Sequence, residues 1–205
     1  MYDALIFDLD GTLVDNVKII TKAWNEISKK YGWNLHVDEN TIQNCMGKNP
    51  LEIGNMLFPN LENEEVLNRI HTCGKEEIDY IKKEIGKSYI DEKQLQILAA
   101  NQKLFIVSNC MDGYIETYLN VYGFNNYFVE IVNSTTKKTK GENIAYLVKK
   151  YNLKNVAYIG DTIKDYEAAK QAKVDFIHAA YGYGIVNYPN KINNINELIT
   201  KNIGK

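Results

Sequence analysis

FDLDGTLVD, residues 7–15, is the stretch that decides the fold. It begins at the last residue of a short apolar run, residues 4–7, which has the composition of a buried strand. It places Asp8 and Asp10 two residues apart, so strand periodicity directs both carboxylates toward one side. Two ionised carboxylates this close in a partly buried crevice repel each other unless a cation or proton intervenes, which indicates Mg²⁺ with oxygen ligands. Taken alone, Asp10-Gly11-Thr12 is more often a simple polar turn.

Outward from this stretch, the chain alternates between predicted strands and helices. Further strands are expected at residues 104–107, 127–132, 156–159 and 174–178. Amphipathic spacing predicts helices between them, on the stripes Ile115, Tyr118, Leu119, Tyr122 and Ile144, Leu147, Val148, Tyr151. This alternation predicts an α/β fold with a parallel sheet covered by helices on both faces, and a ligand crevice beyond the carboxyl ends of its strands.

Residues 16–85 break the alternation and predict an inserted helical subdomain. One helical stripe ends at Gly32 and contains Ile20, Ala23, Trp24, Ile27 and Tyr31. Two further amphipathic stretches, residues 64–73 and 75–85, complete a small bundle over the crevice. We therefore expect a catalytic core formed by residues 1–15 and 86–205, with a cap formed by residues 16–85.

Polar residues also follow two later strands. Ser108 and Asn109 are small neutral groups suited to phosphoryl oxygens, although such a pair is usually a turn or a helix cap. Asp161 and Asp165 add a second pair of oxygen ligands, or alternatively Asp161 is only an N-cap. Between these strands lies a basic cluster of three residues, of which two are expected to be ordinary solvated lysines: Lys137, Lys138 and Lys140.

The composition of the 205-residue chain argues against several classes of partner. A formal net charge of −2 and a pI of about 6.0 give no positive field for nucleic acid or anionic lipid. No apolar stretch approaches membrane-spanning length and no basic leader is visible, so we expect a cytoplasmic protein. Three cysteines without CxxC spacing are expected to stay reduced: Cys45, Cys73 and Cys110.

Together these motifs resemble the haloacid dehalogenase superfamily, specifically its phosphatase branch with a helical cap (phosphoglycolate phosphatase-like). The resemblance rests on FDLDGTLVD, on IVSN at residues 106–109, on a lysine before a helix, and on GDTIKD at residues 160–165. It implies a Rossmann-like core beneath a mobile cap and hydrolysis of a small phosphorylated metabolite. Asp8 would be the nucleophile, and Asp10 the general acid and then the general base.

The resemblance also implies ligands for Mg²⁺ and for phosphate. The ion would be held by the Asp8 side chain, the Asp10 backbone carbonyl and Asp161, with Asp165 in support. The phosphate-binding residues would be Ser108, Asn109, Lys140 and Thr12, the last orienting the loop. The family lysine is commonly followed by proline whereas Lys140 precedes Gly141, so Lys137 or Lys138 remain alternatives; Lys140 is preferred because it lies closest to the helix start.

Other departures narrow the subclass. The usual Pro-Gly near residues 89–92 is missing, which affects the cap hinge. Dehalogenases and phosphonate-cleaving members lack the second acid that Asp10 provides. Sugar-phosphate mutases of similar layout carry a cap histidine where this chain has Ile20, so mutase activity is a weaker alternative.

Substrate choice would depend on the loop at residues 46–50, where Lys48 could bind an anionic substituent or be an ordinary loop lysine. From a different class of function, a phosphorylatable signalling receiver or a silent binding protein remain alternatives. The receiver has no place for the insertion after the first strand. We expect a monomer or a homodimer.

Overall fold

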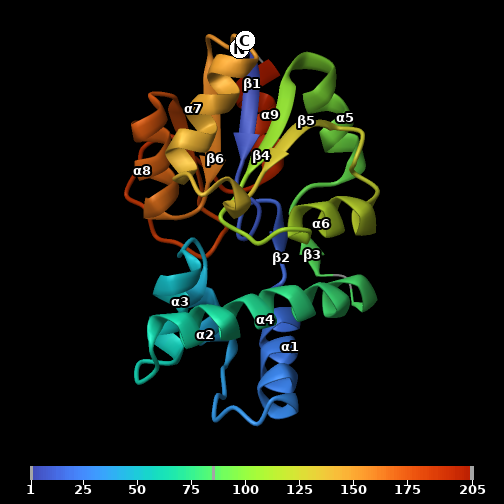
Figure 1. Cartoon of the computed structure of the whole chain (residues 1–205). Helices are drawn as coiled ribbons and strands as arrows, with labels where there is room; N and C mark the ends of the chain where they lie inside the picture. The colour runs from blue at the N-terminus through green and yellow to red at the C-terminus, as the bar shows by residue number, and fades with distance from the viewer. Residues whose placement is uncertain (1, 85, 204–205) are drawn as a thin grey trace.

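The computed structural model describes residues 2–84 and 86–203, and it contains a six-stranded, fully parallel sheet in the order β5-β4-β1-β6-β7-β8 (Figure 1). The strands are β1 (Ala4–Phe7), β4 (Lys103–Val107), β5 (Phe128–Val132), β6 (Val156–Gly160), β7 (Asp175–Ala179) and β8 (Lys191–Ile192). The five expected strands are confirmed to within one residue at each end. The two-residue β8 was not expected.

Helices cover both faces of the sheet because successive strand side chains point in opposite directions. Leu5 and Phe7 of β1 belong to the core on the face covered by α5 (Glu92–Asn101), α6 (Tyr114–Tyr122) and α9 (Ile195–Ile203). Ala4 and Ile6 belong to the core under α7 (Lys140–Lys150) and α8 (Ile163–Ala172). The predicted α/β class, Rossmann-like with helices on both faces, is confirmed.

Four helices lie together beyond the carboxyl ends of the strands (Figure 1): α1 (Val17–Lys30), α2 (Glu39–Cys45), α3 (Pro50–Leu57) and α4 (Asn63–Lys83). The chain enters this group through β2 (Val14–Asp15) and leaves it through β3 (Lys87–Ser88), which pair as a short antiparallel ribbon. The division into a core and a cap at residues 15/16 and 85/86 stays a proposal, and we call α1–α4 the helical group.

One prediction about the helical group is wrong, because residues 64–73 and 75–83 form the single helix α4 rather than two helices. Gly74 is therefore inside a helix, and a Cβ at this position would lie 2.1 Å from the Sδ of Met111. Packing against α6 and its preceding loop thus compensates for a residue that weakens isolated helices. Residue 85, the predicted end of the second helix, lies outside the described residues.

Within residues 2–84 and 86–203, no helix is both long enough and apolar enough to cross a bilayer.

Candidate active site

Side chains from separate strand ends meet at one edge of the sheet. Asp8 follows β1, Ser108 follows β4 and Asp161 follows β6, and all three are buried. The Asp8 amide donates to the Ile159 carbonyl at 2.8 Å, which ties the end of β1 to its neighbour β6. Gly11 then turns the chain with φ +78°, and a Cβ there would lie 2.3 Å from Asp161 Oδ2. The glycine is thus required both for the turn and for the approach of Asp161.

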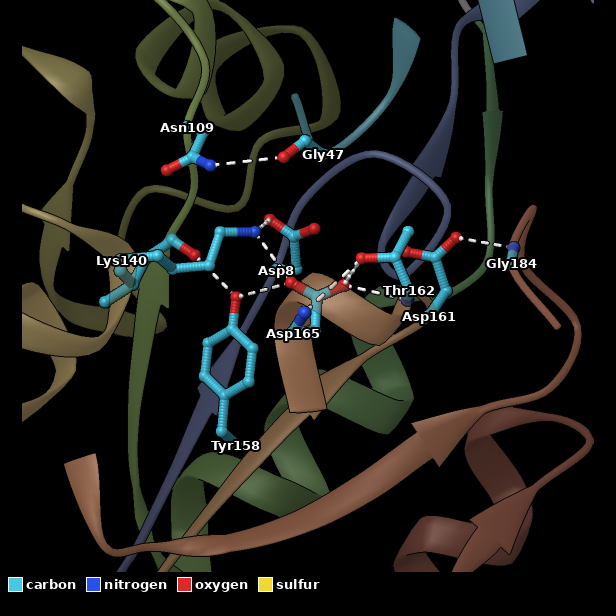
Figure 2. A network of polar contacts seen from close by, with 10 residues as sticks. Asp8, Gly47, Asn109, Lys140, Tyr158, Asp161, Thr162, Asp165 and Gly184 are labelled. Carbon is cyan, nitrogen blue, oxygen red and sulfur yellow. Dashed lines mark hydrogen bonds and ion pairs between the residues drawn. The ribbon is translucent and has the colours of Figure 1, made fainter. Parts of the chain in front are cut away.

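A buried ion-pair network occupies this edge (Figure 2). The Lys140 ammonium lies 2.7 Å from Asp165 Oδ1 and 3.1 Å from Asp8 Oδ1. Burial alone would lower the pKa of Lys140, but the two carboxylates outweigh this effect and raise it. Lys137 and Lys138 are exposed, so among the three candidate lysines only Lys140 reaches the acids. Lys140 is also the first residue of α7, whose capping box between Thr139 and Glu142 fixes the helix start.

Asp165 is held on both of its oxygens. Oδ2 accepts from the Thr162 amide at 2.9 Å and from the Thr162 hydroxyl at 2.7 Å, which completes the capping box of α8. Oδ1 accepts from Lys140 and, at 3.4 Å, from the Tyr158 hydroxyl. Burial would raise the pKa of Asp165, but Lys140 and the Thr162 donors bring it below its ordinary value. Asp165 is therefore an ionised group that positions Lys140.

Asp161 has one oxygen bound and one free. Oδ2 accepts from the Tyr183 amide at 2.8 Å and from the Gly184 amide at 3.4 Å. Oδ1 is buried, and no donor among the described residues reaches it. Burial and the negative charges of Asp165 and Asp8 raise the pKa of Asp161. The protein therefore supplies too little positive charge and too few donors to offset the cost of burying this carboxylate.

The donor set fits Mg²⁺. Asp8, Asp161 and Asp165 each offer a carboxylate oxygen within 4.8 Å of the others. Three carboxylates against the one ammonium of Lys140 leave two negative charges uncompensated. Hard oxygen ligands and an excess of negative charge are what Mg²⁺ requires. Asp161 is the best placed direct ligand because no donor among the described residues reaches its buried Oδ1. Asp8 Oδ1 is contacted only by the Lys140 ammonium at 3.1 Å, whereas both oxygens of Asp165 accept hydrogen bonds.

Asp10 lies in a different environment from these three acids. Its Oδ1 accepts from the Tyr114 hydroxyl at 2.8 Å, and that hydroxyl in turn accepts from the Asn16 amide at 3.1 Å. Burial raises the pKa of Asp10 to about 7, with the negative charge of Asp8 adding to the shift and Tyr114 opposing it. A carboxyl group that titrates near neutral pH can both give and take a proton. The contact expected between the Asp10 backbone carbonyl and Mg²⁺ stays a prediction.

The remaining predicted site residues differ in whether they line the pocket next to Asp8. Ser108 and Asn109 line the pocket above Asp8, and the Asn109 amide donates to the Gly47 carbonyl at 3.4 Å. Thr12 is buried beneath the loop, outside the pocket lining, and its carbonyl accepts from the Tyr181 hydroxyl at 2.9 Å. This position fits the predicted orienting role better than a direct phosphate contact. Lys48 lines the pocket, but its ammonium donates to the Asn44 carbonyl.

A cavity of about 100 Å³ separates the strand ends from the helical group. It is smaller than the roughly 300 Å³ or more of drug-sized sites, so it suits a small leaving group. We call Asp8 and the residues around it at this edge of the sheet the floor of the cavity. The floor consists of Asp8, Ser108, Lys140, Asp161 and Asp165. We call the pocket-lining residues of the helical group the roof: Ile20, Trp24, Ile42, Cys45, Met46, Gly47, Lys48, Pro50, Ile53, Ile70, Gly74 and Glu77.

Sequence reasoning missed three groups at this site. The first is the pair of amides at Tyr183 and Gly184, for which the repeated glycines in AYGYG were a signal; a Cβ at Gly182 would lie 2.4 Å from Asp161 Cβ. The second is Tyr114, which had no signal beyond its place at the start of a helix. The third is the buried Glu77, for which the signal was its place on the buried stripe of α4, four residues after Cys73 and four before Ile81.

The chain is similar to known proteins over most of its length. The family model described as haloacid dehalogenase-like hydrolase matches residues 5–179. A phosphoglycolate phosphatase of Psychrobacter arcticus is 26% identical over 211 residues, with 94% of this chain and 88% of the relative covered. The corresponding protein of Colwellia psychrerythraea is 27% identical over 205 residues, with coverages of 93% and 88%.

Solved structures show the same fold over the whole chain. A structure titled as a predicted phosphatase from Clostridium acetobutylicum is 25% identical with a TM-score of 0.79, and both chains are covered to 100%. A structure titled as a predicted phosphoglycolate phosphatase from Haemophilus somnus is 21% identical with a TM-score of 0.82 and covers 100% of this chain and 98% of its own. The second likeness carries information on the fold alone.

Proposed function

The chain belongs to the haloacid dehalogenase-like hydrolase family as a phosphoric monoester hydrolase, and from this premise we propose that it works through a phosphoryl ester on Asp8 with the help of Mg²⁺. The observation that carries the proposal is the position of Asp8. Its carboxylate lies at the strand ends and lines the pocket, and the Lys140 ammonium 3.1 Å from Oδ1 holds it in place. A nucleophile has to be positioned in this way with a lone pair open to the substrate.

In the first step, an oxygen of Asp8 attacks phosphorus, and the bond from phosphorus to the ester oxygen breaks. Asp10 gives its proton to the departing oxygen, which leaves as an alcohol. In the second step, water attacks the phosphoryl group on Asp8 while Asp10 takes up a proton, and inorganic phosphate leaves. Tyr114 supports this role because its hydrogen bond fixes one oxygen of Asp10 and leaves the other for the proton.

The phosphoryl oxygens are bound by two floor residues and by Asn109. Lys140 supplies a positive charge, while Ser108 and Asn109 supply neutral donors from the end of β4. The fixed start of α7 and the two bonds from Thr162 to Asp165 hold Lys140 in place before the substrate arrives. Such preorganised donors stabilise charge that develops in the transition state.

Asp8 and Asp161 would bind Mg²⁺ directly, with Asp165 in support. When bound, the ion neutralises the charge between the carboxylate nucleophile and the anionic phosphate. The amides of Tyr183 and Gly184 orient Asp161 for this role.

We further propose a small phosphorylated metabolite as the substrate, since the cavity is small and the relatives named above are phosphoglycolate phosphatases. The helical group would form a cap domain over the core, and the protein would act in the cytoplasm as a monomer or homodimer. Sugar-phosphate mutase activity is less favoured because Ile20 lines the pocket where a proton-transferring group would be needed.

Phosphate release from 4-nitrophenyl phosphate tests this function. We expect turnover with Mg²⁺, loss of turnover after chelation with EDTA, and recovery when the ion is restored. Acid-quenched samples with labelled substrate should contain protein-bound phosphoryl. Equal turnover in EDTA would contradict the metal requirement, and no release from a broad panel of phosphate esters would contradict the phosphatase itself.

A further inference from the structure

Glu77 is a buried acid in the pocket roof that the proposed reaction does not use. It lies on α4, is only 7% exposed and lines the cavity together with Asp10. Its Oε2 accepts a hydrogen bond from the Trp24 indole of α1. No donor among the described residues reaches its Oε1, so one oxygen of this pocket-lining carboxyl group has no hydrogen-bond donor from the protein.

The surroundings of Glu77 contain no countercharge. None of the ion pairs among the described residues includes it. The roof cation, Lys48, donates to the Asn44 carbonyl instead. Burial, together with the nearby negative charge of Asp10, raises the pKa of Glu77 to about 8. A buried acid without a cation destabilises the protein, so its presence in a pocket wall points to a ligand that supplies the missing charge.

We propose that Glu77 is the specificity-determining residue of this phosphatase, and that it selects phosphomonoesters whose alcohol part ends in a protonated amine. This inference deepens the proposed function and rests on it. The phosphate of such a substrate would lie on the floor at Asp8 and Lys140, and its ammonium group would donate to Oε1 of Glu77. Trp24 adds to the attraction, because an indole is the aromatic ring that binds cations best.

The apolar residues of the roof fit the short carbon chain between these two charged ends. Ile20, Ile53 and Ile70 line the same cavity and offer no polar atom to a substrate substituent. A substrate that ends in a carboxylate would instead face the like charge of Glu77 or force it to stay protonated. Phosphoglycolate should therefore be a poor substrate here, although relatives of this chain are named for it.

A matched series of esters tests the proposal on the full-length protein with Mg²⁺. The series consists of 2-aminoethyl phosphate, 2-hydroxyethyl phosphate and 2-phosphoglycolate, with 3-aminopropyl phosphate to vary the chain length. We expect the highest kcat/KM for an amine ester and the lowest for phosphoglycolate. In Glu77→Gln, which keeps an acceptor for the Trp24 indole, kcat/KM for the amine ester should fall about 10-fold or more, and the advantage over phosphoglycolate should shrink.

Asp79→Asn is the matched control, since it removes one carboxylate from the exposed face of the same helix and should leave the order and the rates unchanged. Each ester is also measured as an inhibitor of 4-nitrophenyl phosphate hydrolysis, so that an ester that binds but turns over slowly still reports its affinity.

Three results would overturn the proposal: a preference for the hydroxyl or carboxylate ester, an unchanged order in Glu77→Gln, or no turnover and no inhibition by either amine ester. Failure of the proposed function is seen separately, as absence of 4-nitrophenyl phosphate hydrolysis by the unmodified protein.

Discussion

The floor and the roof of the pocket treat acidic side chains in opposite ways. On the floor, Lys140 and backbone amides contact the carboxylates, and Asp161 Oδ1 is a buried oxygen that no donor among the described residues reaches. In the roof, Glu77 lies among apolar residues with a single hydrogen bond and no cation. The floor thus fits the proposed reaction on a phosphoryl group, while the roof contains a buried carboxyl group without a cation, which we propose pairs with a cationic substrate. Under this proposal, reaction and substrate selection are located in different parts of the chain.

Removal of the nucleophile should have the largest effect and should be confined to the floor. We expect Asp8→Asn to lower kcat/KM by about 10⁴-fold or more, because an amide cannot attack phosphorus and the loss of a nucleophile removes the covalent route. Steady-state hydrolysis of 4-nitrophenyl phosphate measures the effect, and circular dichroism checks the fold. If more than about 1% of the activity survived, Asp8 would not be the nucleophile, since covalent catalysis contributes far more than that.

Loss of the floor cation should reduce both activity and stability. In Lys140→Met, Asp8 and Asp165 lose their shared countercharge in a buried setting, so the free energy of unfolding should fall by about 3 kcal/mol at pH 7 without Mg²⁺. With Mg²⁺, kcat/KM should fall by about 100-fold or more, because a charged donor to the phosphoryl group is lost. Urea denaturation and steady-state kinetics measure the two effects.

Lys138→Met is the control for this variant. Lys138 is exposed and lies two residues away, so both quantities should stay close to those of the unmodified protein. Equal losses in the two variants would mean that the wrong lysine has been assigned to the floor.

Much of the floor could be predicted from the sequence, because the carboxyl ends of parallel strands meet at one edge. Asp8, Ser108 and Asp161 each directly follow an apolar run that predicts a strand, and Asp165 lies four residues after Asp161 in α8. Of the three candidate lysines, the structure brings Lys140 to the acids from the first turn of α7, and its phosphate-binding role stays a prediction. The fold class followed from the same alternation of strands and helices.

The roof was harder to predict, because spacing indicates which face of a helix is buried but not what that face contacts. Glu77 lies at helical spacing between Cys73 and Ile81 on the buried stripe of α4, whereas Asp79 is exposed, but the spacing does not show that this stripe faces a cavity. The continuity of α4 was missed at Gly74, which usually weakens a helix but here makes room for Met111. For Lys48, substrate binding and an ordinary loop position were both left open; its ammonium donates to the Asn44 carbonyl of α2, and a contact with substrate stays a prediction.

The pH dependence of stability should separate the roof acid from the floor acids. The pKa of Glu77 is raised to about 8 in the folded protein, so the stability it contributes is complete below its ordinary value near 4.5 and is lost as the pH rises through 8. Between pH 5 and pH 9, the free energy of unfolding should therefore fall by about 2 kcal/mol more in the unmodified protein than in Glu77→Gln. This is less than the full shift implies, because the cavity admits water.

Urea denaturation at pH 5, 7 and 9 without Mg²⁺ gives this difference. The floor acids are present in both proteins, so their contributions cancel to first order. Asp79→Asn should follow the unmodified protein at every pH. Parallel profiles for Glu77→Gln and the unmodified protein would mean that the carboxyl group is not buried against the apolar roof in solution.

The smallest effect should come from a surface ion pair between α8, which contains the floor residue Asp165, and α3 of the helical group. Lys164 of α8 lies 2.5 Å from Glu52 of α3, and both side chains are more than one-third exposed. An exposed pair of this kind contributes about 0–1 kcal/mol, so Lys164→Ala should change the free energy of unfolding by less than about 1 kcal/mol. Because the pair bridges the two sides of the pocket, its loss should raise KM by about twofold at low salt and have no effect at 1 M salt.

Lys170→Ala is the control for this variant. Lys170 is an exposed residue of the same helix that belongs to no ion pair among the described residues, so its replacement should leave KM unchanged at both salt concentrations. A large loss of kcat in Lys164→Ala would show instead that closure of the helical group over the floor depends on this contact, and the separation of reaction from substrate selection would then be incomplete.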